Sequence, residues 1–325
     1  MLDRRRFVAL SSASALAPSF ARVAQAQAYP TRFVRLVVPF PPGGGTDAIA
    51  RVVAVKLSQI WRHEMVIENK GGGATSIGTD AVAKAEPDGH TVLLQSVPLA
   101  VNKYLFPSLP FDPVADLAPV SLLCDYPNIM AVPLSSPAKT VQEFIDHAKA
   151  NPGKVTYASS GYGTSVHLSG ELFRRMARVD IRHIPYRGAG PAFNDLIPGR
   201  VDVMFNNSGA VLPLIKGGQL RALGVTSLKR ARELPDVPTI SEAGVPGFDV
   251  TGWYAFFVPA RTPPQVIAKL NADTVAALAD PVIRERLDQL GVGVVGSTPE
   301  ALRAYLKAEM DKWGGIIKEA GIKPE

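Results

Sequence analysis

The chain has 325 residues, and its lysines and arginines exceed its aspartates and glutamates by six. After the first 28 residues, no run of basic residues forms the footprint of a nucleic-acid-binding protein, and no segment approaches the roughly 18 consecutive apolar residues of a membrane helix. The single cysteine, Cys124, excludes an intrachain disulfide framework. A chain of this length can bury a hydrophobic core and is near the size at which a core divides, so we expect two lobes.

The first 28 residues have the layout of a secretory signal peptide. They read MLDRRRFVALSSASALAPSFARVAQAQA, with a basic start, a short stretch of small and apolar residues and a small-x-small ending. Arg4-Arg5 resembles a twin-arginine export signal, with the general export route as the alternative. A membrane anchor fits less well because the apolar stretch is too short to span a bilayer. We expect cleavage after Ala28, which makes Tyr29 the first residue of an exported protein.

Strand-like and helix-like segments alternate between residues 33 and 95. The segment 46–61 places Ile49, Val53 and Leu57 on one helical face. Alternation of this kind predicts βαβ units and a parallel sheet. The expected strands are 33–38, 65–68 and 91–95, and the expected helices are 46–61 and 76–85.

A second alternating series follows a stretch that prolines interrupt at positions 107, 110 and 113. Its pattern again indicates strands connected by amphipathic helices. The expected helices are 141–150, 165–177 and 190–197, and the expected strands are 154–160, 181–186, 201–205 and 220–226.

The tail of the chain differs from both series. It contains one more apolar strand, 253–260, and then helices between 264 and 318 with no strand between them. Returning this tail to the first lobe creates two crossovers, near 122–132 and 248–257, and therefore a hinge beside a ligand cleft. We predict a two-lobed α/β fold of this kind, with two lobes in series and a helical cap as the alternative. The expected lobes are 29–126 plus 250–325, and 127–249.

Two loops share the pattern G-x-G-T followed by a small polar residue, and each follows a strand and starts a helix. The first turn of a helix has backbone N–H groups without intrahelical partners, and glycines let an anion approach them. Two such turns across a cleft could hold one carboxylate from both sides; the alternative is that both are ordinary helix caps. The loop residues are Gly43, Gly44, Gly45, Thr46 and Asp47 in the first loop, and Gly161, Gly163, Thr164 and Ser165 in the second.

Other chemistries find little support in the sequence. There is no Walker A string and no complete G-x-G-x-x-G, so no nucleotide cofactor is expected. The five histidines form no zinc-binding pattern, so no metal is expected. The serines lack the G-x-S-x-G frame of a hydrolase, although residue types alone do not exclude a Ser-His-Asp triad.

Five segments together resemble the Bug family, the extracytoplasmic solute receptors of tripartite tricarboxylate transporters. They read YPTRFVRLVVPFPPGGGTD, VIENKGGGATSIGTDAVAKAEPDGHT, YASSGYGTSVHLSGELF, IPYRGAGPAFNDLIPGRVDVMF and LPDVPTISEAGVPGF. The resemblance implies a periplasmic, type II binding-protein fold without catalysis. It also implies a carboxylate ligand and membrane transporter subunits as partners. A receptor that uses the same cleft for signalling is the alternative, and in either case we expect a monomer that does not bind nucleic acid.

The resemblance places the binding elements at residues 42–47 and 159–167, with 71–76 as a further wall of the cleft. It adds Thr75, Ser76 and Ser159 to the expected ligand contacts. His167 lies in the second element and Asn207 follows an apolar strand, where α/β clefts bind ligands; each could equally be an ordinary polar surface residue. Asp47 either contacts the ligand or stabilises the helix N-terminus.

Overall fold

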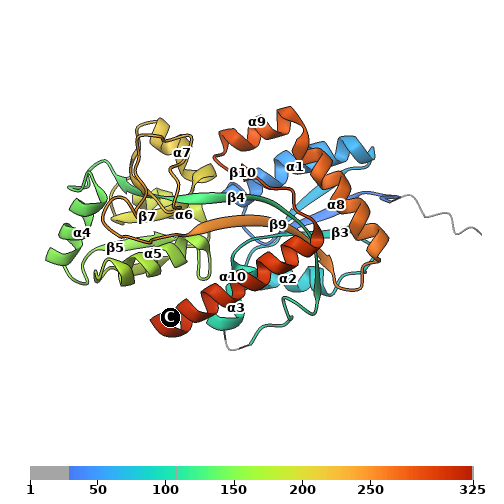
Figure 1. Cartoon of the computed structure of the whole chain (residues 1–325), viewed down its shortest axis with the longest axis horizontal. Helices are drawn as coiled ribbons and strands as arrows, with labels where there is room; N and C mark the ends of the chain where they lie inside the picture. The colour runs from blue at the N-terminus through green and yellow to red at the C-terminus, as the bar shows by residue number, and fades with distance from the viewer. Residues whose placement is uncertain (1–28, 107, 324–325) are drawn as a thin grey trace, which may run out of the picture.

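The computed structural model describes residues 29–106 and 108–323. Two lobes lie side by side along the long axis of the molecule (Figure 1). One continuous sheet passes through both of them, in the strand order β2-β1-β3-β9-β4-β7-β5-β6. Strands β1 and β5 each pair in parallel with two neighbours, whereas β9 and β4 (Leu117–Pro133) run antiparallel to their partners, so the sheet is mixed where the strand-helix alternation predicts a parallel one.

The first lobe follows the predicted alternation closely. Helix α1 buries Ile49, Val53 and Leu57 against the sheet, as its apolar spacing predicts. The stretch between β3 and Pro107 contains a further helix, α3, which is not among the expected elements. The elements are β1 (Val34–Val38), α1 (Gly45–Trp61), β2 (Met65–Asn69), η1 (Gly73–Thr75), α2 (Ser76–Ala83), β3 (Thr91–Gln95) and α3 (Pro98–Leu105).

The second lobe contains every predicted element of the second series and one more helix, α7. Pro213 lies inside α7, and a proline there removes a backbone donor, which weakens the helical signal. The elements are α4 (Val141–Ala150), β5 (Thr156–Ser159), α5 (Ser165–Met176), β6 (Arg182–Pro185), α6 (Ala189–Leu196), β7 (Val203–Asn207), α7 (Ser208–Lys216) and β8 (Leu220–Val225).

The tail packs on the first lobe. Strand β9 lies between β3 and β4, helices α8 and α9 pack on α1, and α10 packs on α3. The prediction of no strand among the tail helices is wrong, because β10 pairs with β4. Strand β10 has only two residues, too few to show the alternation of side chains that marks a strand in a sequence. Only its pairing with β4 identifies it as a strand. The elements are β9 (Thr251–Pro259), α8 (Pro264–Ala279), α9 (Pro281–Gln289), β10 (Gly293–Val294) and α10 (Pro299–Ala320).

Strand β4 connects the two lobes. Up to Pro127 it pairs with β9, and from Asn128 onward it pairs with β7 and β8. We propose to divide the lobes here, between residues 126 and 127, and again between 249 and 250 just before β9. This change of strand partners supports the division.

A buried glutamate joins the returning tail to the sheet. Glu309 Oε2 on α10 accepts hydrogen bonds from the indole N–H groups of Trp253 (3.1 Å) and Trp313 (3.2 Å). Both tryptophan side chains are fully buried, so their N–H groups need this acceptor. The Trp253 contact joins α10 to β9, whereas the Trp313 contact lies within α10 itself.

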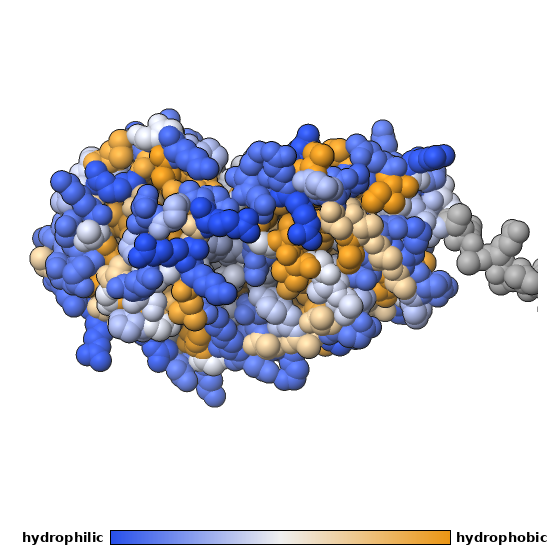
Figure 2. Space-filling view, turned by 45° about the horizontal axis from the view of Figure 1, so that its top comes forward, coloured by the Kyte–Doolittle hydropathy of each residue, from blue (hydrophilic) through white to orange (hydrophobic). Residues whose placement is uncertain are grey.

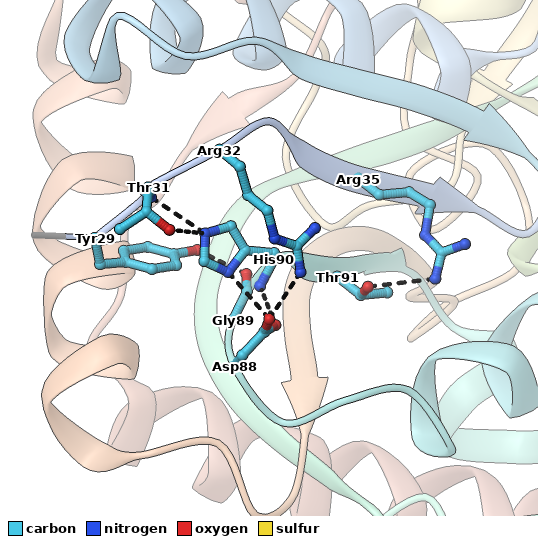
Figure 3. Close-up of polar contacts among 8 residues, drawn as sticks. All are labelled: Tyr29, Thr31, Arg32, Arg35, Asp88, Gly89, His90 and Thr91. Carbon is cyan, nitrogen blue, oxygen red and sulfur yellow. Dashed lines mark hydrogen bonds and ion pairs between the residues drawn. The ribbon is translucent and has the colours of Figure 1, made fainter. Parts of the chain in front are cut away.

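The first described residues are bound to the first lobe, as Figure 3 shows. The Tyr29 hydroxyl donates to the carbonyl oxygen of Gly89 at 2.7 Å, and its ring lies edge-on to His90. The same ring also lies edge-on to Trp61. Arg32 forms an ion pair with Asp88 at 2.8 Å. Tyr29 is therefore part of the packed first lobe.

Polar side chains cover most of the face in Figure 2, and hydrophobic residues appear there as separate patches. Within the described ranges, no helix has the length and apolar character needed to cross a bilayer.

Candidate functional site

A small chamber of about 80 Å³ lies between the two lobes. Backbone and hydroxyl groups line it from both sides, and Arg187 is the one charged residue in its wall. The first lobe contributes Phe40, Pro41, Pro42, Gly44, Gly45, Thr46, Ser96 and Tyr126; the second contributes Ser160, Thr164, Ser165, Val166, Arg187, Gly188, Ala189, Gly190, Pro191 and Asn207.

The first loop leaves the start of α1 open to the chamber. Gly43 has a φ of +85°, which a residue with a Cβ rarely adopts, and this turn directs the chain from β1 into α1. The N-cap residue Gly44 has no side chain to accept a hydrogen bond from the first turn. The N–H groups at the start of α1 are therefore available to a ligand.

Asp47 supports the first loop and lines neither the chamber nor the groove outside it. Its carboxylate accepts hydrogen bonds from the Gly43 N–H (3.1 Å), Arg51 Nε (2.9 Å) and Asn69 Nδ2 (3.0 Å). Burial alone would raise the pKa of Asp47, but these hydrogen bonds outweigh it and hold the pKa below its ordinary value. Asp47 is thus a carboxylate at neutral pH that stabilises the glycine turn from behind.

The second loop is held by a different arrangement. The Thr164 hydroxyl donates to the Gly161 carbonyl at 2.7 Å and accepts from the His167 N–H at 3.3 Å, so it caps α5. The Gly163 N–H donates to Nδ1 of His167 at 3.3 Å. Burial, together with the charges of His183 and Arg174, lowers the pKa of His167 to about 3, so its ring is neutral and can accept this bond. His167 stabilises the loop from behind and does not line the chamber.

Tyr126 lines the chamber at the junction of the lobes. Tyr126 stacks on Tyr254 with 4.6 Å between ring centroids, and its hydroxyl lies 3.5 Å from the Ser165 hydroxyl. Ser165 in turn donates to Asn128 Oδ1 at 3.3 Å. Burial raises the pKa of both tyrosines, so they remain neutral hydrogen-bonding groups.

Two further helix starts reach the chamber from the second lobe. Helix α6 follows Gly188, which has a φ of +105° and provides no side-chain cap. Helix α7 follows Asn207, whose Oδ1 accepts from the Ala210 N–H at 3.2 Å. Segment 188–191 is not among the predicted site residues, although YRGAG repeats the strand-glycine-helix pattern of the other loops.

The lobes touch each other around the chamber. A Cβ on Gly45 would lie 2.5 Å from Asn207 Oδ1, and a Cβ on Gly163 would lie 2.6 Å from Asn102 Oδ1. Elsewhere the Ser208 hydroxyl donates to the Gly291 carbonyl at 2.6 Å. At two of these points, Gly45 and Gly163, the lack of a side chain permits the opposite lobes to approach closely. The two lobes are therefore in a closed arrangement.

A wider groove of about 670 Å³ continues from the chamber toward the surface and shares Phe40, Pro41, Ser160, Thr164, Arg187 and Gly188 with it. Of the predicted site residues, Gly44, Gly45, Thr46, Thr164, Ser165 and Asn207 line the chamber, and Thr75, Gly161 and Thr164 line the groove. The remaining predicted residues, Gly43, Asp47, Ser76, Ser159, Gly163 and His167, line neither.

One serine-histidine pair is present behind the second loop. Ser159 Oγ lies 2.7 Å from His183 Nε2, but Ser159 is fully buried and neither residue lines the chamber or the groove. Among the described residues, no group of three or more His, Cys, Asp or Glu side chains is placed to hold a metal ion.

Comparison with known proteins gives one consistent result. The family described as "Tripartite tricarboxylate transporter family receptor" matches residues 49–322. A UPF0065 protein from the tcbD-tcbE intergenic region of Pseudomonas sp. strain P51 is 42% identical over 319 residues, covering 98% of this chain and 95% of that protein. Protein BugT of Bordetella pertussis is 39% identical over 300 residues, covering 92% of each.

Solved structures agree with these sequence matches. The periplasmic binding protein BugD has a TM-score of 0.87 at 37% identity, over 91% of this chain and all of that one. Rpa4515 of R. palustris with adipate has a TM-score of 0.89 at 35% identity, over 92% and 100%. MatC from Rhodopseudomonas palustris with bound malate has a TM-score of 0.85 at 33% identity, over 89% and 100%. The chain therefore has the α/β periplasmic binding-protein fold.

The contacts of Asp47 predict a stability effect that depends on pH. Asp47→Ala should lower the free energy of unfolding at pH 7 by about 1–3 kcal/mol, because it leaves donors of the first loop without their acceptor. The pKa of Asp47 in the folded state is below its unfolded value of about 3.9. The difference in unfolding free energy between the wild type and the variant should therefore have its full size above that pH. It should disappear as the pH falls through the folded-state pKa. Urea denaturation at several pH values measures it.

Asp311→Ala is the matched control, since Asp311 pairs with Lys307 four residues away but both side chains are mostly exposed. Its effect should stay within about 0.5 kcal/mol. If both variants lost the same stability, the supporting role of Asp47 would be wrong.

Proposed function

The chain belongs to the tripartite tricarboxylate transporter receptor family, a family of solute-binding receptors and not of enzymes, and we propose that it captures a small organic carboxylate between its two lobes. We further propose that it delivers this ligand to the membrane subunits of a tripartite transporter.

The observation that carries the proposal is the meeting of four helix starts, from α1, α5, α6 and α7, around one chamber. Helix N-termini attract anions through their unpaired N–H groups and their dipoles. The hydroxyl-bearing residues Thr46 and Ser96 also line the chamber, and no acidic residue lines its wall. Each charge-assisted hydrogen bond contributes about 1.5–3 kcal/mol, so several shared between the lobes would favour the closed arrangement.

The relatives support the carboxylate. Rpa4515 was solved with adipate and MatC with malate, and both share the fold of this chain over nearly its whole length. Both ligands carry carboxylates, the type of group that the chamber fits. Donors from both lobes would then bind the same group, which couples ligand binding to closure.

We also propose that residues 1–28 are a signal peptide and that the mature protein is periplasmic, as its relative BugD is. These residues lie outside the described part of the chain. Tyr29, the residue that cleavage after Ala28 would expose, is docked on the first lobe through its hydrogen bond to Gly89. The intact mass of protein recovered from a periplasmic fraction should correspond to a chain that begins at Tyr29; a mass that retains residues 1–28 would contradict the proposal.

Thermal unfolding with a panel of organic acids tests the binding function. A ligand that binds only the folded state raises the melting temperature by mass action, so at least one mono-, di- or tricarboxylate at millimolar concentration should do so. Gly45→Ala should abolish most of this shift, because its Cβ would meet Asn207 and prevent closure.

Gly315→Ala on α10 is the matched control, since a Cβ there would meet no atom within 4 Å and Gly315 does not line the chamber. It should keep the shift. The proposed function fails if no acid in the panel raises the melting temperature, and the closure argument fails if the two variants respond equally.

A further inference from the structure

We infer that the ligand is an aromatic monocarboxylate, with its carboxylate in the chamber and its ring in the outer groove. This inference rests on the proposed carboxylate-binding function and adds the class of the ligand. The relatives solved with adipate and malate hold dicarboxylates, so the inference separates this chain from them.

The volumes of the two cavities differ strongly. The chamber of about 80 Å³ has room for a carboxylate and a few adjoining atoms, whereas the groove measures about 670 Å³. Phe40, Thr164 and Arg187 line both, so the two cavities adjoin each other. A ligand anchored in the chamber therefore extends into the groove.

The walls of the groove suit a flat apolar group. Three aromatic side chains line it, those of Phe40, Tyr162 and Tyr186, together with three prolines, Pro39, Pro41 and Pro185. On the first lobe the wall is the backbone of segment 71–73, three consecutive glycines. Aromatic rings stack favourably on one another, and the glycine backbone leaves open the space that side chains would occupy.

A second carboxylate would find no second cation in this groove. Arg187 is the one charged residue among the sixteen that line it, and it stands at the junction with the chamber. The Tyr186 hydroxyl already donates to Asp195 at 2.8 Å, and the Thr164 hydroxyl to Gly161. A charge placed beyond Arg187 would lose water without a cation in return, whereas an apolar ring gains by leaving water.

Isothermal titration calorimetry with 3-phenylpropionate and adipate tests the inference. The two acids present the same carboxylate on a short chain but end in a ring or in a second carboxylate. We expect 3-phenylpropionate to bind at least tenfold more tightly. Adipate binding as tightly or more tightly would overturn the inference while leaving the proposed function intact, and failure of both acids to bind would overturn the inference and count against carboxylate binding.

Gly71→Ile tests the position of the ring. Gly71 lines the groove without a positive φ, and its Cβ would make only ordinary contacts of 3.5 Å with Phe40 and Pro41. Isoleucine should therefore be tolerated by the backbone but fill the groove, and should weaken 3-phenylpropionate at least tenfold. Gly71→Ala should change the affinity less than threefold.

Gly315→Ile on α10 is the control for the substitution itself, since a Cβ there would meet no atom within 4 Å. Thermal unfolding without ligand verifies that each variant folds. If Gly71→Ile folds and binds 3-phenylpropionate as the Gly315→Ile variant does, the ring does not lie in the groove and the inference is wrong.

Discussion

Backbone N–H groups at the start of a helix have no partner within that helix, and the site depends on bringing several such starts together. Helices α1, α5, α6 and α7 begin around one chamber, the first in one lobe and the other three in the second. An anion satisfies donors from both sides only when the lobes are close. In the proposed function, the donors that bind the ligand would therefore also couple its binding to closure of the lobes.

This constraint explains where the charged and the small residues lie. Asp47 and His167 stand behind the loops and hold the Gly43 and Gly163 N–H groups. A carboxylate facing the chamber would repel an anion, whereas behind the turn it orders the donors. Gly45, in contrast, lies at the contact with Asn207, where the carbon of a methyl group would lie only 2.5 Å from Asn207 Oδ1. Strand β4, which pairs with both halves of the sheet, carries Tyr126 to the floor of this contact.

Much of this architecture could be predicted from the sequence because it depends on local patterns. Periodicity predicted α1, α4 and α5, and the repeated G-x-G-T predicted two of the four helix starts. Helix α7 is not predicted because Pro213 interrupts its signal. Pro98 at the first turn of α3 is compatible with a helix start, but α3 has only eight residues, too few to show a clear helical period. Strand β10 was missed because only its pairing with β4 defines it. The positions of Asp47 and His167 behind their loops depend on contacts with Asn69 and Gly163 that no spacing rule describes.

The outer groove, too, could not be predicted from local sequence patterns. Its glycines, prolines and aromatic residues come from four separate segments, which only the closed fold brings together.

The central claim, that one carboxylate is held by helix starts of both lobes, is tested most directly by a crystal structure with the tightest-binding acid. We predict carboxylate oxygens at about 2.7–3.2 Å from backbone nitrogens at the starts of both α1 and α5. A carboxylate bound to Arg187 alone, without contacts to the backbone nitrogens at these helix starts, would contradict the account.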